Sequence, residues 1–194
     1  MGESGPTVRM FVAIEAPGTI CRIMASAREF LGTFEKDLKW IESDNIHITV
    51  KFLGDVEERT IPQILDSVDR VTAETRAFRL CTQQVGGGPR MDQARVVWLG
   101  WGGETGILSD LHGRLEDAVE VLGIPKEKRR YYPHITFARA TRKPVDLPGE
   151  VAELSNPVHF MVERLVIFRS DLRPDGAVYT PLGYSVFRDR TSAG

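Results

Sequence analysis

Alternating apolar and polar positions mark two short segments of the chain as half-buried β-strands. The segments His47-Ile48-Thr49-Val50 and His134-Ile135-Thr136-Phe137 each read histidine, apolar, threonine, apolar. Because side chains two positions apart on a strand project from the same face, each tetrapeptide places an imidazole beside a hydroxyl and turns its apolar residues to a core. The copies lie too far apart for one local motif, so we expect two matched halves that bring these strands together.

The segments that precede the two tetrapeptides repeat the same order of patterns. Apolar runs over residues 8–14 and 95–101 predict strands, and the apolar residues after each run recur at intervals of three and four, which is typical of a helix lying on a sheet. A strand, helix, strand unit therefore occurs twice. We expect one domain over residues 1–194, with a first repeat over about 8–86 and a second over about 95–187.

Other patterns complete the expected set of elements. A helix is predicted from Thr60, and strands are predicted over residues 78–85, 158–168 and 178–187. The run Gly86-Gly87-Gly88-Pro89-Arg90 is predicted to be a flexible loop between the halves. A glycine run can also cradle a phosphate, but the Lys-Ser/Thr that completes such a loop is absent here.

Composition narrows the class of protein. With 194 residues, 42% hydrophobic and 27% charged, the chain is that of an ordinary soluble globular protein. A net charge of −2 excludes a polycation that coats nucleic acid, so a phosphate ligand must be held by local charge. No apolar run is long enough to cross a bilayer, so no membrane partner is expected.

Cysteine usage and the amino terminus favour a cytoplasmic location. Cys21 and Cys81 are widely spaced and form no Cys-x-x-Cys pair, which indicates a reduced protein. Residues 1–7 have neither a basic start nor an apolar stretch, so no signal peptide is predicted.

Two histidines on facing strands suit displacement at phosphorus. One group must take a proton from the attacking oxygen, and another must protonate the leaving oxygen on the opposite side. His47 and His134 can do both near neutral pH, because an ordinary imidazole has a pKa of about 6.5. Thr49 and Thr136 can bind the non-bridging phosphate oxygens, and Arg139 can neutralise the same charge.

Other roles for the two histidines fit the pattern less well. A single histidine on a strand usually has a structural role, with its hydrogen bonds made within the fold. A structural role does not explain two histidines that are each followed by a threonine at the same spacing. A zinc site needs a third ligand, and neither tetrapeptide has a carboxylate, a cysteine pair or a His-Glu-x-x-His motif beside it. We therefore expect no metal and no cofactor. His112 and His159 lack matched partners and are expected to be structural or surface residues.

Three further residues are weaker candidates for substrate contacts. Phe11 could stack on a base, and Lys51 shares the face of His47 if the strand alternates regularly. Arg130 belongs to a basic loop, residues 126–130, that borders the second tetrapeptide and could steer a polyanion. Each of these residues could equally belong to the core or to the solvated surface.

Several segments, taken in order, resemble the RNA 2′,3′-cyclic phosphodiesterases, also called 2′-5′ RNA ligases, of the two-histidine (2H) phosphoesterase superfamily. The resemblance spans about residues 8–187. The segments that carry it are Phe11-Val12-Ala13-Ile14, Asn45-Ile46-His47-Ile48-Thr49-Val50-Lys51-Phe52-Leu53-Gly54, Val97-Trp98-Leu99-Gly100, Pro133-His134-Ile135-Thr136-Phe137-Ala138-Arg139 and Leu165-Val166-Ile167-Phe168-Arg169-Ser170.

The resemblance implies a bilobal α+β fold, with two antiparallel β-sheets related by a pseudo-twofold axis, helices on the outside and a central active-site groove. It implies metal-independent hydrolysis of RNA 2′,3′-cyclic phosphate ends to 2′-phosphates, and 2′-5′ ligation in some members. The resemblance places His47, Thr49, His134 and Thr136 at the family's catalytic positions, with the two threonines binding phosphate, and Arg139 at a phosphate-contacting position. As a hypothesis, His134 is the base and His47 the acid, although pseudo-symmetry allows the reverse.

The expected partners are RNA ends with a 2′,3′-cyclic phosphate, tRNA fragments among them, or nucleotides, and the protein is expected to be a monomer. Two alternatives stay open. One is a 2H enzyme acting on a small cyclic nucleotide or an ADP-ribose cyclic phosphate. The other is a nucleotide- or RNA-binding module without catalysis, although both histidines are retained.

Overall fold

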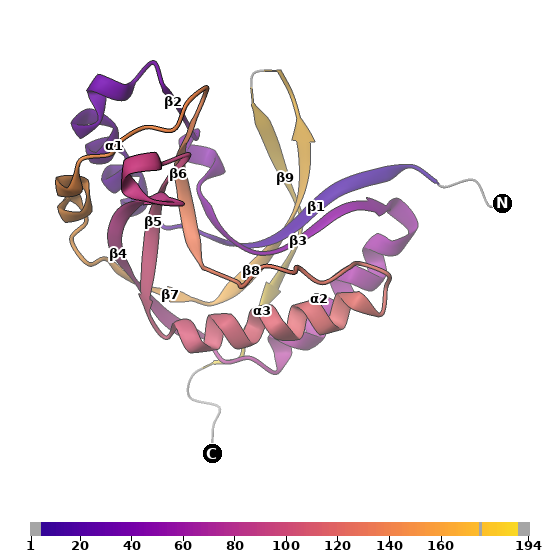
Figure 1. Cartoon of the computed structure of the whole chain (residues 1–194). Helices are drawn as coiled ribbons and strands as arrows, with labels where there is room; N and C mark the ends of the chain where they lie inside the picture. The colour runs from indigo at the N-terminus through magenta and orange to yellow at the C-terminus, as the bar shows by residue number, and fades with distance from the viewer. Residues whose placement is uncertain (1–4, 175, 190–194) are drawn as a thin grey trace.

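The computed structural model describes residues 5–174 and 176–189, and these form nine strands and three α-helices with short 3-10 turns between them (Figure 1). The strands are β1 (Thr7–Glu15), β2 (Leu38–Trp40), β3 (His47–Glu57), β4 (Phe78–Gly88), β5 (Val96–Gly103), β6 (His134–Ala140), β7 (His159–Val162), β8 (Arg164–Leu172) and β9 (Ala177–Val186). The helices are α1 (Thr19–Phe30), α2 (Ile61–Ala73) and α3 (Thr105–Glu120), and the 3-10 turns are η1 (Gly32–Phe34), η2 (Ser43–Asn45), η3 (Glu58–Thr60), η4 (Met91–Gln93) and η5 (Gly149–Leu154).

The strands form two antiparallel sheets, which confirms the predicted α+β class. The first sheet has the order β3-β1-β8-β9 and the second the order β2-β6-β5-β4-β7. Each tetrapeptide opens a strand, β3 or β6, that pairs with the strand before its helix, β1 or β5. The halves also exchange strands, because β2 and β4 join the second sheet while β8 and β9 join the first.

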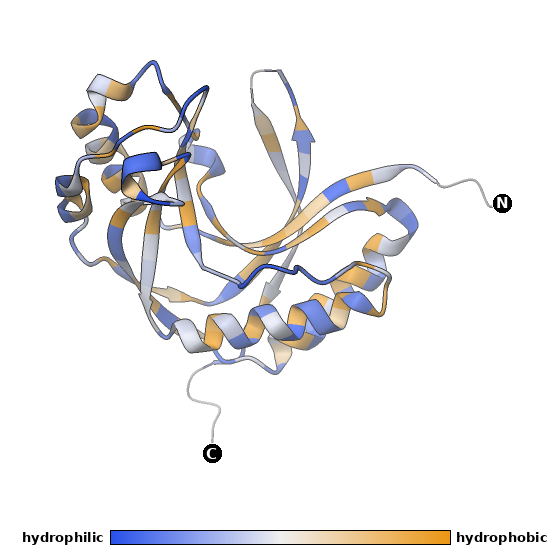
Figure 2. Cartoon of the chain, viewed as in Figure 1, coloured by the Kyte–Doolittle hydropathy of each residue, from blue (hydrophilic) through white to orange (hydrophobic). Residues whose placement is uncertain are grey.

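Helices cover the sheets, as their apolar stripes predict. Helix α1 buries Ile20, Ile23, Met24 and Ala27. Helices α2 and α3 pack against each other, and they contact β9 and β3 of the first sheet, respectively. Figure 2 shows these helices as alternating polar and apolar bands, with apolar residues frequent along the strands. Among the helices of residues 5–174 and 176–189, none combines the length and apolarity needed to span a membrane.

The strand predicted over residues 158–168 is wrong in one respect, because the chain changes sheets in its middle. β7 pairs with β4 in the second sheet, and β8 pairs with β1 in the first. Glu163 lies between them and is exposed. A continuous apolar pattern cannot distinguish one long strand from two short strands joined at a corner.

The predicted glycine loop is also wrong. Gly86, Gly87 and Gly88 are the last residues of β4 and pair with Trp98, Val97 and Val96 of β5. Glycine is depleted in strands because it offers no side chain to pack, so the pattern favoured a loop. A close neighbour is the reason for glycine here, since a Cβ at Gly86 would lie 2.6 Å from Cζ2 of Trp98.

A β-bulge in β3 reverses the alternation just after the first tetrapeptide. Ala13 of β1 pairs with Thr49, but Val12 pairs with Lys51, so Val50 is an extra residue. Lys51 therefore faces the core with Val12, and the prediction that it shares the face of His47 is wrong.

The second half repeats this bulge at the equivalent position. Trp98 of β5 pairs with Thr136 and Val97 pairs with Ala138, so Phe137 is the extra residue of β6. Arg139 follows His134 by an odd number of positions, and a regular strand would turn the two side chains to opposite faces. The bulge brings Arg139 back to the face of His134.

Candidate active site

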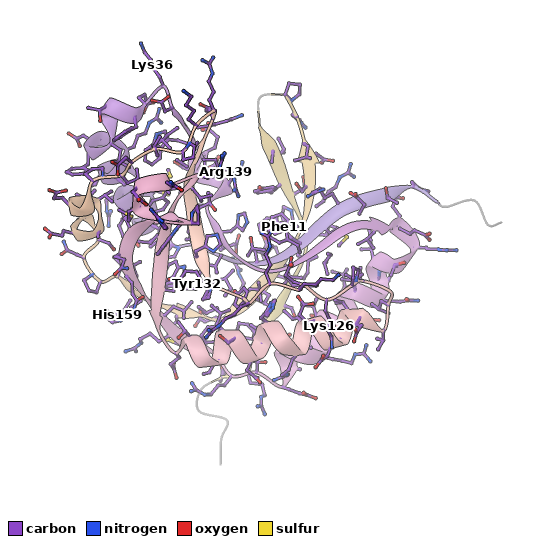
Figure 3. All side chains as sticks on the ribbon, in the orientation of Figure 1. Phe11, Lys36, Lys126, Tyr132, Arg139 and His159 are labelled. Atoms are coloured by element: carbon purple, nitrogen blue, oxygen red, sulfur yellow. The ribbon has the colours of Figure 1, made fainter. Side chains whose placement is uncertain are left out.

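Both tetrapeptides face one cavity between the two sheets. Its volume is about 470 Å³, and His47, Thr49, His134 and Thr136 all line it. Phe11 of β1, Arg139 of β6 and Tyr132, which precedes β6, also line it (Figure 3). The structure therefore brings together the residues that the sequence placed in two separate motifs.

The imidazole of His47 is held in one orientation by the backbone before it. Its Nδ1 lies 2.7 Å from the carbonyl oxygen of Asn45. A carbonyl oxygen can only accept, so Nδ1 carries the proton, and Nε2 of the neutral ring has a free lone pair. Oγ1 of Thr49 lies 3.0 Å from Nε2 and can donate its hydroxyl proton there. Asn45 is fixed in turn, because its side chain donates to the carbonyl oxygen of Ala177 in β9.

Burial keeps His47 neutral. Loss of hydration lowers the pKa of its imidazole to about 4, against a smaller opposing effect of the hydrogen bond to Asn45. The nearby His134 lowers the pKa further, which indicates that the two rings are close enough to repel when both are charged. At neutral pH the free site therefore holds His47 as the neutral imidazole.

His134 is positioned by the same device as His47. Its Nδ1 donates to the carbonyl oxygen of Tyr132, at 2.8 Å, two residues before it in the chain. The matching contact of His47 is also with the residue two positions earlier. His134 differs in being exposed to solvent, so one imidazole of the pair is desolvated and the other is hydrated.

Aromatic side chains pack around His47. The ring of Phe11 lies 4.8 Å from the imidazole centroid, and the ring of Tyr179 lies 5.3 Å away, edge-on. Phe11 is 3% exposed and also contacts Phe168. Its ring is covered by these neighbours, so it supports His47 and has little free surface for stacking on a base.

Phe52 is a cavity residue that the sequence reasoning missed. It pairs with Phe11 across β1 and β3, and it is 63% exposed. The bulge at Val50 turns it to the face of His47, where it lines the cavity. Regular alternation would have placed it on the opposite face, so only the register of β3 reveals it.

Cationic side chains line the cavity around the histidines. Arg139 and Arg130, both predicted, are exposed at its wall, as are Arg129 and Arg9, which were not singled out. Arg139 and Arg9 also lie near Tyr179, because their charges oppose the rise in the pKa of that phenol that burial causes. The cavity thus offers a local positive charge on a chain whose net charge is −2.

Lys51 supports the cavity wall from the core side. Its ammonium is buried, with Nζ 2.7 Å from Oε2 of Glu116 and 2.9 Å from the carbonyl oxygen of Pro125. Lys51 is among the residues that line the cavity, and two of the three N–H donors of its ammonium are taken by these partners. His112 also lines the cavity, where it donates through Nδ1 to the carbonyl oxygen of Val50, at 2.7 Å, and stacks on Tyr131.

A metal site would need a cluster of ligating side chains. Within the part of the chain that the structure describes, no three or more His, Cys, Asp or Glu side chains are grouped closely enough to hold a metal ion. His159 is exposed on β7, outside the set of residues that line the cavity.

Comparison with known proteins finds similar sequences and a similar fold. Residues 18–174 match the sequence profile of the 2′-5′ RNA ligase superfamily. An RNA 2′,3′-cyclic phosphodiesterase of Methanothermobacter thermautotrophicus is 31% identical over 185 residues, which is 93% of this chain and 98% of that protein. One of Aeropyrum pernix is 33% identical over 116 residues, covering 60% of this chain and 65% of that protein. The crystal structure of TT0787 of Thermus thermophilus superposes with a TM-score of 0.79 at 28% identity, over 94% of this chain and 99% of that one.

Proposed function

Because the chain belongs to the 2′-5′ RNA ligase superfamily, we propose that it hydrolyses RNA 2′,3′-cyclic phosphate ends to 2′-phosphates by proton transfer between His47 and His134. The observation that carries the proposal is the matched pair of imidazoles in one cavity, each fixed through Nδ1 by the carbonyl oxygen two residues before it. The similar proteins of Aeropyrum pernix and Methanothermobacter thermautotrophicus are both named RNA 2′,3′-cyclic phosphodiesterases, which supports an RNA cyclic phosphate as the substrate.

The reaction needs only groups that line the cavity. A water molecule loses a proton to one histidine as its oxygen bonds to phosphorus. The bond from phosphorus to O3′ breaks, the other histidine protonates O3′, and the phosphate remains on O2′. Negative charge builds on the two non-bridging oxygens, where Thr49, Thr136 and Arg139 can donate hydrogen bonds. A 5′-hydroxyl in place of water would give a 2′-5′ linkage by the same steps.

The protonation state of His47 favours a role for it as the base. Its Nδ1 proton is committed to Asn45 and its depressed pKa leaves Nε2 unprotonated, which is the form that accepts a proton from water. His134 is hydrated and would then protonate O3′. This reverses the assignment favoured from the sequence, in which His134 is the base and His47 the acid.

We further propose that the protein acts on these RNA ends, including tRNA fragments, as a single cytoplasmic domain and a monomer. The cationic side chains at the cavity wall, with Arg129, Arg130 and Arg139 among them, support a polyanionic substrate. The groups that the reaction uses are all protein side chains, so we expect activity without an added metal or cofactor.

Product analysis tests the proposal. A short RNA ending in a 2′,3′-cyclic phosphate is incubated in EDTA with wild-type protein and with His47→Ala, His134→Ala and His159→Ala, the last being the matched control outside the cavity. We expect wild type and His159→Ala to form the 2′-phosphate. In His47→Ala and His134→Ala the rate of hydrolysis should fall by at least about a hundredfold. Activity that EDTA abolishes and zinc or manganese restores would overturn the proton-transfer mechanism. No turnover of RNA, with turnover of a cyclic mononucleotide or an ADP-ribose cyclic phosphate, would overturn the substrate.

A further inference from the structure

The indole of Trp98 lies across a bed of glycines on the inner face of the second sheet. Trp98 pairs with Thr136, and directly paired residues of antiparallel strands point to the same face. A Cβ would lie 2.6 Å from its Cζ2 atom at Gly86, 3.0 Å from Cζ3 at Gly100 and 3.5 Å from Nε1 at Gly88. Three glycines on two strands thus contact different edges of one ring, which requires the ring to lie along the sheet.

The residue that carries this indole is only partly buried. Trp98 is half-buried, whereas Trp40 and Trp101 are 8% and 6% exposed, so Trp98 is the most exposed of the three tryptophans. Tyr132 stands edge-on to it, with ring centroids 5.7 Å apart, and is itself 60% exposed. The ring of Tyr132 in turn stacks near His134, at 6.4 Å. We call Trp98 and Tyr132 the aromatic ledge, which begins at the catalytic cavity and extends beyond the residues that line it.

Cations flank the aromatic ledge on the same face. Arg139 pairs with Val96, two positions before Trp98, and Lys39 of β2 pairs with Arg139 on its other side. Both side chains are exposed. A flat aromatic surface beside positive charge suits a nucleotide, whose base stacks on the ring while its phosphate contacts the cations.

We propose that the aromatic ledge is a stacking site for the nucleobase adjacent to the cyclic-phosphate terminus. The preferred substrate is then an unpaired RNA end of at least two nucleotides, and a cyclic mononucleotide is the poorer one. This inference rests on the proposed function, since it places the terminal phosphate between His47 and His134. It also explains the glycine at position 86, because a Cβ there would lie 2.6 Å from Cζ2 of Trp98 and would displace the indole.

Binding of reaction products tests the aromatic ledge without turnover. Tryptophan fluorescence is titrated with adenosine 2′-monophosphate and with an adenine dinucleotide that ends in a 2′-phosphate. We expect the dinucleotide to bind about tenfold more tightly and to quench the fluorescence. Trp98→Phe should keep the affinity, measured by competition, but lose the quenching, while Trp101→Phe should keep both. Equal affinity and equal quenching by the two ligands would overturn the proposal.

Kinetics provide a second test with a structural control. The measured quantity is kcat/KM for the dinucleotide cyclic phosphate divided by that for the cyclic mononucleotide. Trp98→Leu and Gly86→Ala should lower this ratio about tenfold, and Gly18→Ala, where an added Cβ meets nothing within 4 Å, should not. An unchanged ratio in Trp98→Leu would mean that the indole only fills space over the glycines. If Trp98→Leu fails to fold, the fluorescence of Trp98→Phe compared with that of Trp101→Phe still shows whether the base stacks on Trp98. Failure to hydrolyse either substrate would instead refute the proposed function.

Discussion

Nζ of Lys51 lies 2.7 Å from Oε2 of Glu116, and the two side chains are only 3% and 6% exposed. This buried ion pair joins β3 to α3 at the wall of the catalytic cavity. Lys51 also donates to the carbonyl oxygen of Pro125, and Glu116 accepts from the backbone N–H of Glu127. The pair therefore fixes the start of the basic loop over residues 126–130 that lines the cavity.

Removal of one partner of this pair should destabilise the protein strongly. Lys51→Met leaves the carboxylate of Glu116 buried without its cation, and we expect the free energy of unfolding to fall by about 3–5 kcal/mol. Urea unfolding measures this change. Arg59→Met is the control, because Arg59 pairs with Glu57 at the surface and should cost less than about 1 kcal/mol. A loss in Lys51→Met no larger than in the control would contradict the role given to the buried pair.

Stability should fall in mild acid because of His47. The pKa of its imidazole is about 4 in the folded protein and about 6.5 when unfolded, so between these values the unfolded chain binds more protons. The destabilising effect is absent above about pH 6.5 and grows as the pH falls towards about 4, reaching about 2 kcal/mol of lost stability at about pH 5. The measurement is the free energy of unfolding at neutral pH and at about pH 5. The difference between the two values should be smaller in His47→Gln than in wild type and unchanged in His159→Gln. Equal pH dependence in all three proteins would refute it.

Two phenylalanines that pair across β1 and β3 should respond differently to truncation. Phe11 is 3% exposed and packs on His47, so Phe11→Ala should cost about 3–5 kcal/mol of stability and lower kcat. Phe52 is 63% exposed, so Phe52→Ala should change stability by less than about 1 kcal/mol and raise KM for RNA. Thermal unfolding and steady-state kinetics on the same preparations separate the two effects. A large loss of stability in Phe52→Ala would mean that the side chain of Phe52 is buried in the protein, which contradicts its exposed position in this structure.

Arg139 should act on the substrate phosphate. We expect Arg139→Ala to lower kcat/KM for a cyclic-phosphate RNA by about ten- to a hundredfold, and Arg139→Lys to recover part of it, since lysine keeps the charge but not the paired donors. Arg142→Ala is the matched control, because Arg142 is exposed nearby in the chain but does not line the cavity. Equal losses in the two alanine variants would point to general electrostatic attraction in place of a contact.

Much of this architecture is visible in the sequence because each strand and helix carries its own periodic pattern. The alternation in His47-Ile48-Thr49-Val50 and in its counterpart at His134 predicts the strands and their inward faces, and the structure has both at the start of a strand. The helices follow from their apolar stripes. The pairing of the two histidines followed from the repetition of a whole unit, which no single motif would have justified.

Features that depend on the register between strands were not predictable. The extra residue at Val50 reverses the alternation, so parity placed Lys51 on the strand face of His47 and overlooked Phe52. The same irregularity at Phe137 returns Arg139 to the face of His134, although an odd spacing along a regular strand would have turned it away. The glycine run predicted a loop because the sequence does not show which residue pairs with Gly86. In the structure its partner is Trp98, whose indole packs against Gly86.

A leaving group that needs no proton tests the central claim most directly. In a dinucleotide whose 2′,3′-cyclic phosphate has sulfur in place of O3′, the departing thiolate is stable without protonation, so a general acid is dispensable. His134→Ala should be severely impaired on the oxygen substrate and largely restored on the sulfur substrate, whereas His47→Ala should be impaired on both. If the sulfur substrate restores the activity of His47→Ala but not of His134→Ala, His47 is the acid and His134 the base. Equal impairment of both variants on both substrates would contradict the assignment of one base and one acid to this pair.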